Sequence, residues 1–291
     1  MAKVLVTGAR RGIGLATVIE LARRGHRVVA GTRRPDQIGE LESLASRAGV
    51  SIEPVVLDLT DPRSIADAGS SVTADGVIDV VVNNAGVFPV GPTELTDVKV
   101  MRETFDTNVV GPMLLAQAVL PTMRRQGRGL FVTVSSGARH PRVTPPTFGL
   151  IYAASKAAED CWAESFNKEI AGFGLRSIVV ELGGFDTDMT QAERFAAAVV
   201  SAESPYAAVA VVQDEALRRA PRLPATDAAR CIADLVESPL PPIRTVLPAE
   251  LAALIASASQ ISDDDYIAHC QTASGRDWAR AFQQSLTRKS Q

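Results

Sequence analysis

Two side chains four residues apart, Tyr152 and Lys156, have the types and the spacing of a proton-transfer pair. They lie at the start of an alanine-rich run, residues 153–171, that predicts a helix, and residues four apart share one face of a helix. An ammonium group beside a phenol favours the phenolate and lowers a phenol pKa that is ordinarily about 10. Such a pair could act as a general acid or base near neutral pH. By itself the pair is weak evidence, because this spacing is common on surface helices.

A glycine-rich turn near the N-terminus joins a predicted strand, residues 3–6, to a predicted helix, residues 15–24. The turn contains Gly8, Gly12 and Gly14, with the spacing G-x-x-x-G-x-G. Glycines let backbone amides approach a pyrophosphate closely, and the N-terminus of a helix faces its negative charge. The turn therefore predicts a dinucleotide site, and the alternative is a tight turn that binds no ligand.

The second predicted strand, residues 27–31, runs into Thr32-Arg33-Arg34 and lacks the acidic residue that usually follows such a strand when the ribose 2′-hydroxyl is free. Arg11 in the glycine turn is expected close by. Guanidinium groups suit a 2′-phosphate because they can form bidentate hydrogen bonds with it. We therefore expect NADP(H) in preference to NAD(H), and the alternative is a solvated basic loop.

Seven apolar runs alternate with helical patterns along the chain and predict a parallel sheet of about seven strands, with helices on both faces. This is a Rossmann-type doubly wound α/β fold. The runs are residues 3–6, 27–31, 51–57, 78–82, 129–134, 175–181 and 243–247. We expect residues 1–248 to form this catalytic domain and residues 249–291 to form a helical extension of it.

Most other candidate residues follow the carboxyl ends of predicted strands, where open α/β sheets bind ligands. Asp58 could reach an adenine amino group or cap the next turn. Asn108 lies in a predicted long helix, residues 97–126, that Gly111-Pro112 should kink. A kink there would free a carbonyl for a water molecule, whereas Asn108 taken alone is more simply a satisfied core amide.

Composition excludes several classes of function. The hydrophobic fraction of 46% suits a large core, and a net charge of −3 with pI about 5.7 indicates no nucleic-acid or membrane partner. The three cysteines are widely spaced and suggest reduced thiols in a cytoplasm. The histidines do not have the spacing of metal ligands, so no metal is expected. The chain begins directly with a predicted strand, so no signal peptide is expected.

In order along residues 3–189, the motifs resemble those of the short-chain dehydrogenase/reductase family. They are Thr7-Gly8, Gly12-Ile13-Gly14, Asn83-Asn84-Ala85-Gly86, Asn108, Ser136, Tyr152-x-x-x-Lys156 and Gly183 with Thr187. The run Asn108-Val-Val-Gly-Pro112 and the long tail resemble the hydroxysteroid and retinol dehydrogenase-like branch. Leu182 stands where the family usually has a proline. The gap between Ser136 and Tyr152 is also longer than usual, which leaves Ser135 and Ser136 as alternatives; we expect Ser136 to face the site.

The resemblance implies an oxidoreductase that transfers hydride between NADP(H) and a carbonyl or secondary alcohol of a small-molecule substrate. It makes Asn108, Ser136, Tyr152 and Lys156 the catalytic residues, with Tyr152 as general acid or base. Lys156 would hold the nicotinamide ribose, Ser136 the substrate oxygen, and Asn108 a water molecule. The implied cofactor-binding residues are Gly8, Arg10, Arg11, Gly12, Ile13, Gly14, Arg33, Asp58, Leu59, Asn84, Ala85, Gly86, Tyr152, Lys156, Gly183 and Thr187.

Three further expectations concern the rest of the molecule. The segment at about 187–222 follows the predicted nicotinamide loop and should cover the substrate, with Phe195, Val199, Val200 and Tyr206 facing an apolar ligand or simply packing on the sheet. The resemblance implies a homodimer or homotetramer. The extension could brace the fold, cover the pocket or join a partner subunit.

The alternative function is a non-catalytic NADP(H)-binding redox sensor. A nucleotide-sugar epimerase is a further alternative, but the glycine spacing does not fit that class of enzyme.

Overall fold

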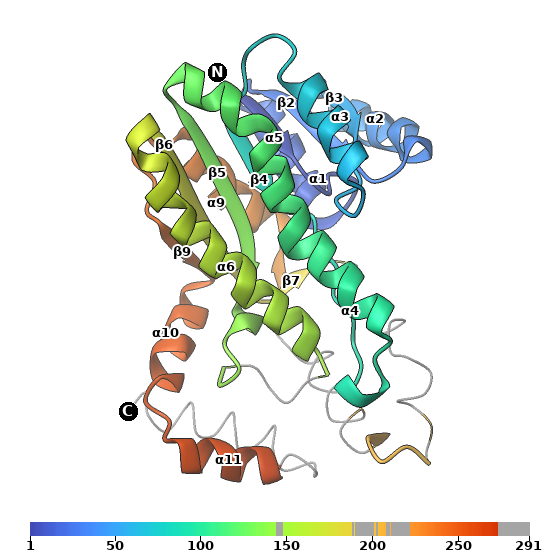
Figure 1. Cartoon of the computed structure of the whole chain (residues 1–291), viewed down its shortest axis with the longest axis vertical. Coiled ribbons are helices and arrows are strands. Elements are labelled where there is room, and N and C mark those ends of the chain that lie inside the picture. The colour runs from blue at the N-terminus through green and yellow to red at the C-terminus, as the bar shows by residue number, and fades with distance from the viewer. Residues whose placement is uncertain are drawn as a thin grey trace.

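A seven-stranded parallel sheet forms the centre of the molecule in the computed structural model of the chain (Figure 1). The structure describes residues 1–143, 148–187, 189, 201, 203–207, 210 and 222–272. The strand order is β3-β2-β1-β4-β5-β6-β9, and every neighbouring pair is parallel. This order, with β1 beside both β2 and β4, confirms the doubly wound topology expected from the sequence.

The strands agree with the sequence prediction to within one or two residues at nearly every boundary. They are β1 Lys3–Val6, β2 Arg27–Thr32, β3 Glu53–Val56, β4 Val80–Asn83, β5 Gly129–Ser136, β6 Leu175–Leu182 and β9 Arg244–Leu247. A separate two-stranded pair joins β7 Phe185–Asp186 to β8 Leu223–Pro224.

The helices that cover the sheet are α1 Gly12–Arg23, α2 Ile38–Arg47, α3 Pro62–Val72, α4 Val98–Phe105, α5 Gly111–Gln126, α6 Leu150–Ile170 and α9 Ala225–Glu237. Helices α10 Ala249–Ala258 and α11 Asp263–Thr272 follow the last strand. Short 3₁₀ turns are η1 Pro35–Gln37, η2 Thr93–Leu95, η4 Gly137–Arg139 and η5 Ala171–Phe173. Two residues account for the start of α3: Asp61 caps it by accepting from the Arg63 amide, and Pro62 occupies the first helical position.

Alternate residues of each strand enter different hydrophobic cores, because successive side chains point to opposite faces of a sheet. In β1, Val4 and Val6 pack with α1 and α9, whereas Leu5 packs with residues of α3 and α5. Figure 1 shows α5 and α6 in front of the sheet and α9 behind it. Burial on both faces explains why these strands are continuous apolar runs.

The predicted long helix forms, and it is interrupted beside Asn108, as expected from Gly111-Pro112. A π-helical turn, η3 Asp106–Val110, lies between α4 and α5, directly before Gly111-Pro112. A Cβ added to Gly111 would lie 2.5 Å from the carbonyl oxygen of Leu59. Glycine is needed for that close approach, and Pro112 stands in the first turn of α5, where no backbone N–H is required.

The extension after β9 contacts the segment that follows β5. Leu251 of α10 lies against Gly137, where an added Cβ would be 2.9 Å from a Leu251 methyl carbon. Arg142 donates to the Ile261 carbonyl at 2.6 Å, pairs with Asp263, and lies over the Tyr266 ring. The predicted helical extension, residues 249–291, is described as far as Thr272, and the remainder lies outside the described residues. Within the described parts of the chain, no helix combines the length and apolar character needed to cross a membrane.

Candidate active site

One face of α6 carries the residues from which the site is built. Tyr152, Ser155, Lys156 and Glu159 are all buried, at three- and four-residue spacing. Farther along the helix, the same face becomes apolar and enters the core through Phe166. The helix therefore positions polar groups at the carboxyl end of the sheet and hydrophobic groups over its middle.

Lys156 makes two hydrogen bonds beside Tyr152. Its Nζ donates to the Val134 carbonyl at 2.8 Å and to Glu159 Oε2 at 2.6 Å, and it lies 5.9 Å from the centre of the Tyr152 ring. Burial disfavours the charged amine, but attraction from Glu159 and Tyr152 outweighs it and raises the pKa of Lys156. Lys156 is therefore a cation throughout the neutral range.

The side-chain amide of Asn108 connects the loop after β4 to α6. Its Oδ1 accepts from the Val87 amide at 2.9 Å, and its Nδ2 donates to the Val87 carbonyl at 3.1 Å and to Ser155 Oγ at 2.9 Å. Ser155 in turn donates to the Tyr152 carbonyl at 2.7 Å. The Asn108 side chain is thus a satisfied core amide, and its bond to Ser155 ties it to the helix that carries Tyr152.

The glycine turn is held tightly against the loop after β4. Thr7 Oγ1 accepts from the amides of Asn84 and Ala85, and Asn84 Nδ2 donates to the Thr7 carbonyl at 2.9 Å. Gly8 has φ +66°, and a Cβ there would lie 2.8 Å from Ala85 Cα. These hydrogen bonds hold the glycine turn and the loop after β4 together.

The loop after β6 closes on the glycine turn from the other side. A Cβ added to Gly12 would lie 3.3 Å from Thr187 Cγ2, so Gly12 and Thr187 face each other. A Cβ added to Gly183 would approach a ring carbon of Pro248 to 3.0 Å. Gly86 also lies in this region, and its added Cβ would be 3.4 Å from Asn108 Oδ1 and 3.8 Å from Lys156 Nζ. The structure therefore gathers these sequence-predicted residues around one edge of the sheet.

Arg33, which lines a pocket, pairs with Asp58. Arg33 Nε donates to Asp58 Oδ2 at 2.9 Å, and Asp58 Oδ1 accepts from the amide and the hydroxyl of Thr60. Burial alone would raise the pKa of Asp58, but the bonds from Thr60 and Arg33 hold it below its ordinary value. Of the two alternatives for Asp58, the turn-capping role is the one present in these contacts.

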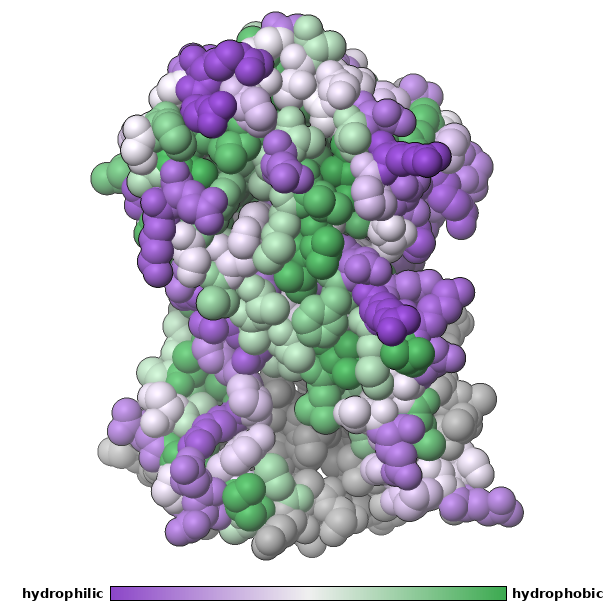
Figure 2. Space-filling model, viewed as in Figure 1, coloured by the Kyte–Doolittle hydropathy of each residue, from purple (hydrophilic) through white to green (hydrophobic). Residues whose placement is uncertain are grey.

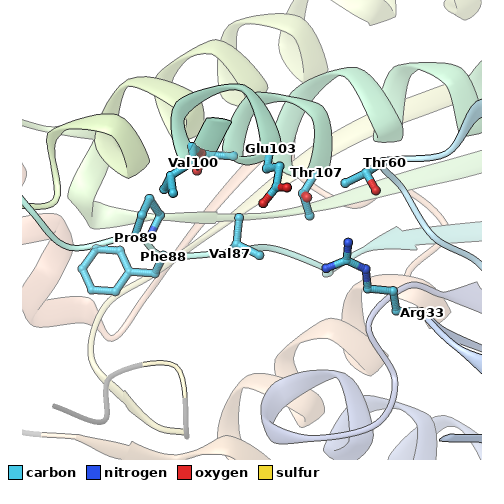
Figure 3. A pocket seen from close by; sticks show the side chains of 9 residues that line it. Arg33, Thr60, Val87, Phe88, Pro89, Val100, Glu103 and Thr107 are labelled. Carbon is cyan, nitrogen blue, oxygen red and sulfur yellow. Dashed lines mark hydrogen bonds between the residues drawn. The ribbon is translucent and has the colours of Figure 1, made fainter. Parts of the chain in front are cut away.

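The pocket continues from Arg33 along α4 towards the site. Figure 3 shows Arg33 on one side, with Thr60, Val87, Glu103 and Thr107 opposite and Phe88, Pro89 and Val100 farther along. Phe88 reaches Tyr152, and the two rings meet edge-on with centres 4.6 Å apart. The sequence analysis did not identify Thr60, Glu103 or Thr107, which lie beside predicted residues but belong to no motif.

Other predicted cofactor residues line the start of α1. Arg10 pairs with Glu40 at 3.1 Å, Arg11 occupies the N-cap position in an extended conformation, and Ile13 packs partly on the core. Leu59 is buried, with its carbonyl beside Gly111.

Ser135 and Ser136 end β5 with different exposure. Ser135 is buried, and its Oγ has no hydrogen-bond partner within the described part of the chain. Ser136 is half-buried and accepts from the Ala138 amide at 3.2 Å. A half-buried hydroxyl is the more accessible of the two to a substrate oxygen.

Of the predicted substrate-covering residues, Phe195, Val199 and Val200 lie outside the described residues. Tyr206 packs edge-on against Phe148 with ring centres 5.8 Å apart, and its hydroxyl donates to Glu94. Val90 joins them in a small apolar cluster.

A buried charged network next to the site was not predicted from the sequence. Arg139 and Arg244 each contact both Asp160 and Glu181, and His140 lies 2.7 Å from Glu181. Glu159 and Ser155 were not predicted either, although their spacing from Tyr152 on one helical face could have indicated them.

Comparisons with known proteins identify the family of this chain. A family model described as short chain dehydrogenase matches residues 2–197, and the chain belongs to that family. Retinol dehydrogenase 8 of Bos taurus is 37% identical over 189 residues, which are 64% of this chain and 59% of that protein. The match thus spans less than two thirds of the bovine protein, and it supports the resemblance to the retinol dehydrogenase-like branch.

Solved structures are similar over most of the chain. A short-chain dehydrogenase from Streptomyces avermitilis has a TM-score of 0.75 and 30% identity, covering 93% of this chain and 95% of that one. A metagenomic short-chain oxidoreductase in complex with NADP has a TM-score of 0.65 and 25% identity, covering 84% of this chain and 96% of that one.

The residues present fit a dinucleotide. Gly8 and Gly14 leave no room for a side chain, so backbone groups line the turn at the N-terminus of α1. Arg33 lies at the end of β2, where a ribose 2′-substituent would be expected. Within the described residues, no group of three or more His, Cys, Asp or Glu side chains is arranged to hold a metal ion.

Proposed function

We propose that this protein is an NADP(H)-dependent oxidoreductase that transfers hydride between nicotinamide and a carbonyl or secondary alcohol. The observation that carries the proposal is the burial of Tyr152 and Lys156 on one face of α6, at the sheet edge where the glycine turn also lies. NADP(H), when bound, supplies or accepts the hydride. The chain's residues supply binding, orientation and proton transfer.

Tyr152 donates a proton to the carbonyl oxygen in reduction and removes it from the alcohol in oxidation. Lys156 keeps its positive charge beside this phenol and donates to the nicotinamide ribose. Ser136 holds the substrate oxygen. Asn108 fixes the position of α6 through Ser155, and its backbone would hold the water molecule that returns protons to the site.

Cofactor binding is assigned to the residues around the glycine turn. Backbone amides from Gly8 to Gly14 hold the pyrophosphate, Arg11 and Arg33 hold the 2′-phosphate, and Thr187 holds the carboxamide. Asp58 orients Arg33 for this contact through its bond to Nε. The NADP in the metagenomic relative supports this choice of cofactor.

The substrate is a small molecule whose apolar part lies near Phe88, Phe148 and Tyr206. Cytoplasmic location is proposed because the three cysteines are free thiols. For assembly, we propose a homodimer or homotetramer. Figure 2 shows apolar side chains along the front face, over α5 and α6, and Ala154 and Ala157 of α6 are exposed. Small exposed residues would let two helices approach closely across a two-fold axis.

The test is the loss of NADPH absorbance with a panel of ketones and aldehydes. Tyr152→Phe should reduce kcat by about a hundredfold to ten-thousandfold, the usual contribution of a general acid, while leaving NADPH affinity nearly unchanged. Tyr266→Phe is the matched control, because it removes the same hydroxyl from α11. Near-normal turnover in Tyr152→Phe would refute the assignment. Tight NADPH binding without turnover on any substrate would favour the redox-sensor alternative.

A further inference from the structure

Glu159 places a buried carboxyl group directly beside Lys156. Its side chain is completely buried, Oε2 lies 2.6 Å from Lys156 Nζ, and Oε1 has no hydrogen-bond partner among the described residues. A buried carboxylate with an unsatisfied oxygen carries a large desolvation cost. The sequence motifs that identify the site do not account for this residue.

Lys156 is the cation that is hydrogen-bonded to Glu159 among the described residues. Arg139 and Arg244 contact Asp160 and Glu181 instead. The titratable and charged groups that surround the pair are Tyr152 and Asp160 of α6, Arg139 and His140 after β5, Glu181 of β6 and Arg244 of β9. Burial, opposed by Lys156, raises the pKa of Glu159 to about 7.

The hydrogen bonds of Lys156 show what this carboxyl group changes. An ammonium has three N–H donors. Lys156 directs one to Glu159 and one to the Val134 carbonyl, which leaves the third for other acceptors. A neutral Glu159 would lose most of its attraction for Nζ. The ammonium could then direct a second donor, and its uncompensated charge, towards the cofactor side of the site.

We infer that Glu159 is a positioning residue whose protonation controls how strongly Lys156 acts on the nicotinamide ribose and on Tyr152. This inference rests on the proposed function. Ionised Glu159 holds Lys156 and partly cancels its charge, whereas protonated Glu159 releases it. The role differs from that of Asn108, which acts on the same helix through a neutral amide.

Two consequences can be measured. Removing the carboxylate leaves the charge of Lys156 uncompensated, which favours the Tyr152 phenolate. The acidic limb of the pH profile for alcohol oxidation should then move to lower pH where it lies above about pH 7, the range in which the wild-type carboxyl is ionised. The shift should be at most about one unit, from the Coulomb energy of a charge several ångströms away. In the wild type, NADPH affinity should weaken by about threefold to tenfold from about pH 6 to about pH 8, as one hydrogen bond to the ribose is lost.

The kinetic experiment compares Glu159→Gln and Glu159→Met with Glu169→Gln. The first two remove the buried charge with nearly the same volume, and the third removes an exposed charge from the same helix. Both Glu159 variants should show the shifted profile, and Glu169→Gln should follow the wild type. Wild-type profiles in folded Glu159 variants would overturn the inference.

A binding experiment needs neither a variant nor turnover. The wild-type affinities for NADPH and for adenosine 2′-phosphate are measured by titration from about pH 6 to about pH 8. The second ligand carries the titrating phosphate but has no nicotinamide ribose, so the ratio of the two affinities isolates the Lys156 contact. A falling ratio supports the inference, and a constant ratio overturns it while the proposed function stands. If the wild-type protein neither binds nor oxidises NADPH, the proposed function is refuted, and this inference is refuted with it.

Discussion

Replacing Gly14 by alanine should damage both the fold and the cofactor site, because this glycine lets α1 approach the turn after β1. A Cβ at this position would lie 2.2 Å from the Gly8 carbonyl oxygen and 2.5 Å from Asn84 Nδ2. The Asn84 side chain can rotate away, but the Gly8 oxygen belongs to the backbone. It must move by about 0.8 Å before the contact reaches 3.0 Å.

The turn has little freedom to make that movement. A Cβ added to Gly8 would lie 2.8 Å from Ala85 Cα, so the turn has little space on that side, and the Gly8 carbonyl oxygen accepts from Asn84 Nδ2 at 3.3 Å. Forcing a methyl group into a packed site costs about 1–3 kcal/mol. For a domain of this size that corresponds to a melting temperature lower by about 2–10 °C. A displacement of this size in a ligand-binding turn should weaken NADPH binding by about tenfold to a hundredfold.

Thermal unfolding and fluorescence titration with NADPH test this prediction against Gly39→Ala. Gly39 is exposed on α2 and has no atom within 4 Å of its added Cβ. Alanine there should raise stability by about 0.5–1 kcal/mol through helix propensity. If the melting temperature and the NADPH affinity of Gly14→Ala equal those of the wild type, α1 does not approach the turn as closely as described.

Three further predictions follow from single contacts. Arg33→Asp should reduce the preference for NADPH over NADH by about tenfold to a hundredfold, because a charge-assisted bond to the 2′-phosphate is lost; an unchanged ratio of the two dissociation constants would contradict the assignment of the cofactor. Burial raises the pKa of Glu159 from 4.5 to about 7, so the folded chain binds this proton more tightly than the unfolded chain. Protonation of Glu159 therefore stabilises the folded chain fully below about pH 4.5, and this stabilisation is lost as pH rises through about 7. The free energy of unfolding falls by at most about 3 kcal/mol over that range. Glu159→Gln should therefore flatten the dependence of the urea midpoint on pH, and a slope equal to that of the wild type would count against a buried titrating carboxyl. Finally, Arg142→Ala removes the contacts to Ile261 and Tyr266 and should speed proteolysis between α10 and α11, which mass spectrometry of the fragments measures; Arg128→Ala, an exposed control, should be cleaved at the wild-type rate.

The fold was largely predictable because its signals are local. The central strands β1, β4, β5 and β6 are rich in valine, isoleucine or leucine and are mostly buried, which a parallel sheet covered on both faces requires. The glycine turn and the helix after it were recognised from spacing alone. The edge of the sheet that gathers Asn84, Tyr152 and Thr187 was predicted correctly, since in parallel α/β folds that edge follows from chain direction.

The details of the site depended on contacts between distant segments. The motif identified Asn108, but the structure shows that its amide bonds to Val87 and Ser155. Asp58 had two possible roles, and the positions of Thr60 and Arg33 favour capping. The interruption of the long helix was expected from Gly111-Pro112, and the structure shows it as a π-turn around Asn108. Pro112 has no N–H to donate to the carbonyl four residues earlier. The close approach of Gly111 to Leu59 was visible only in the structure.

The sequence by itself therefore determined the parallel α/β fold, the glycine turn and the Tyr152–Lys156 pair. Each of these depends on periodicity or on spacing within one segment. Tertiary structure alone decided that Glu159 is buried against Lys156 and that Arg139 and Arg244 contact Asp160 and Glu181 instead. Burial and charge pairing depend on which segments pack together, and spacing along one helix carries no information about the groups that approach it from the other strands.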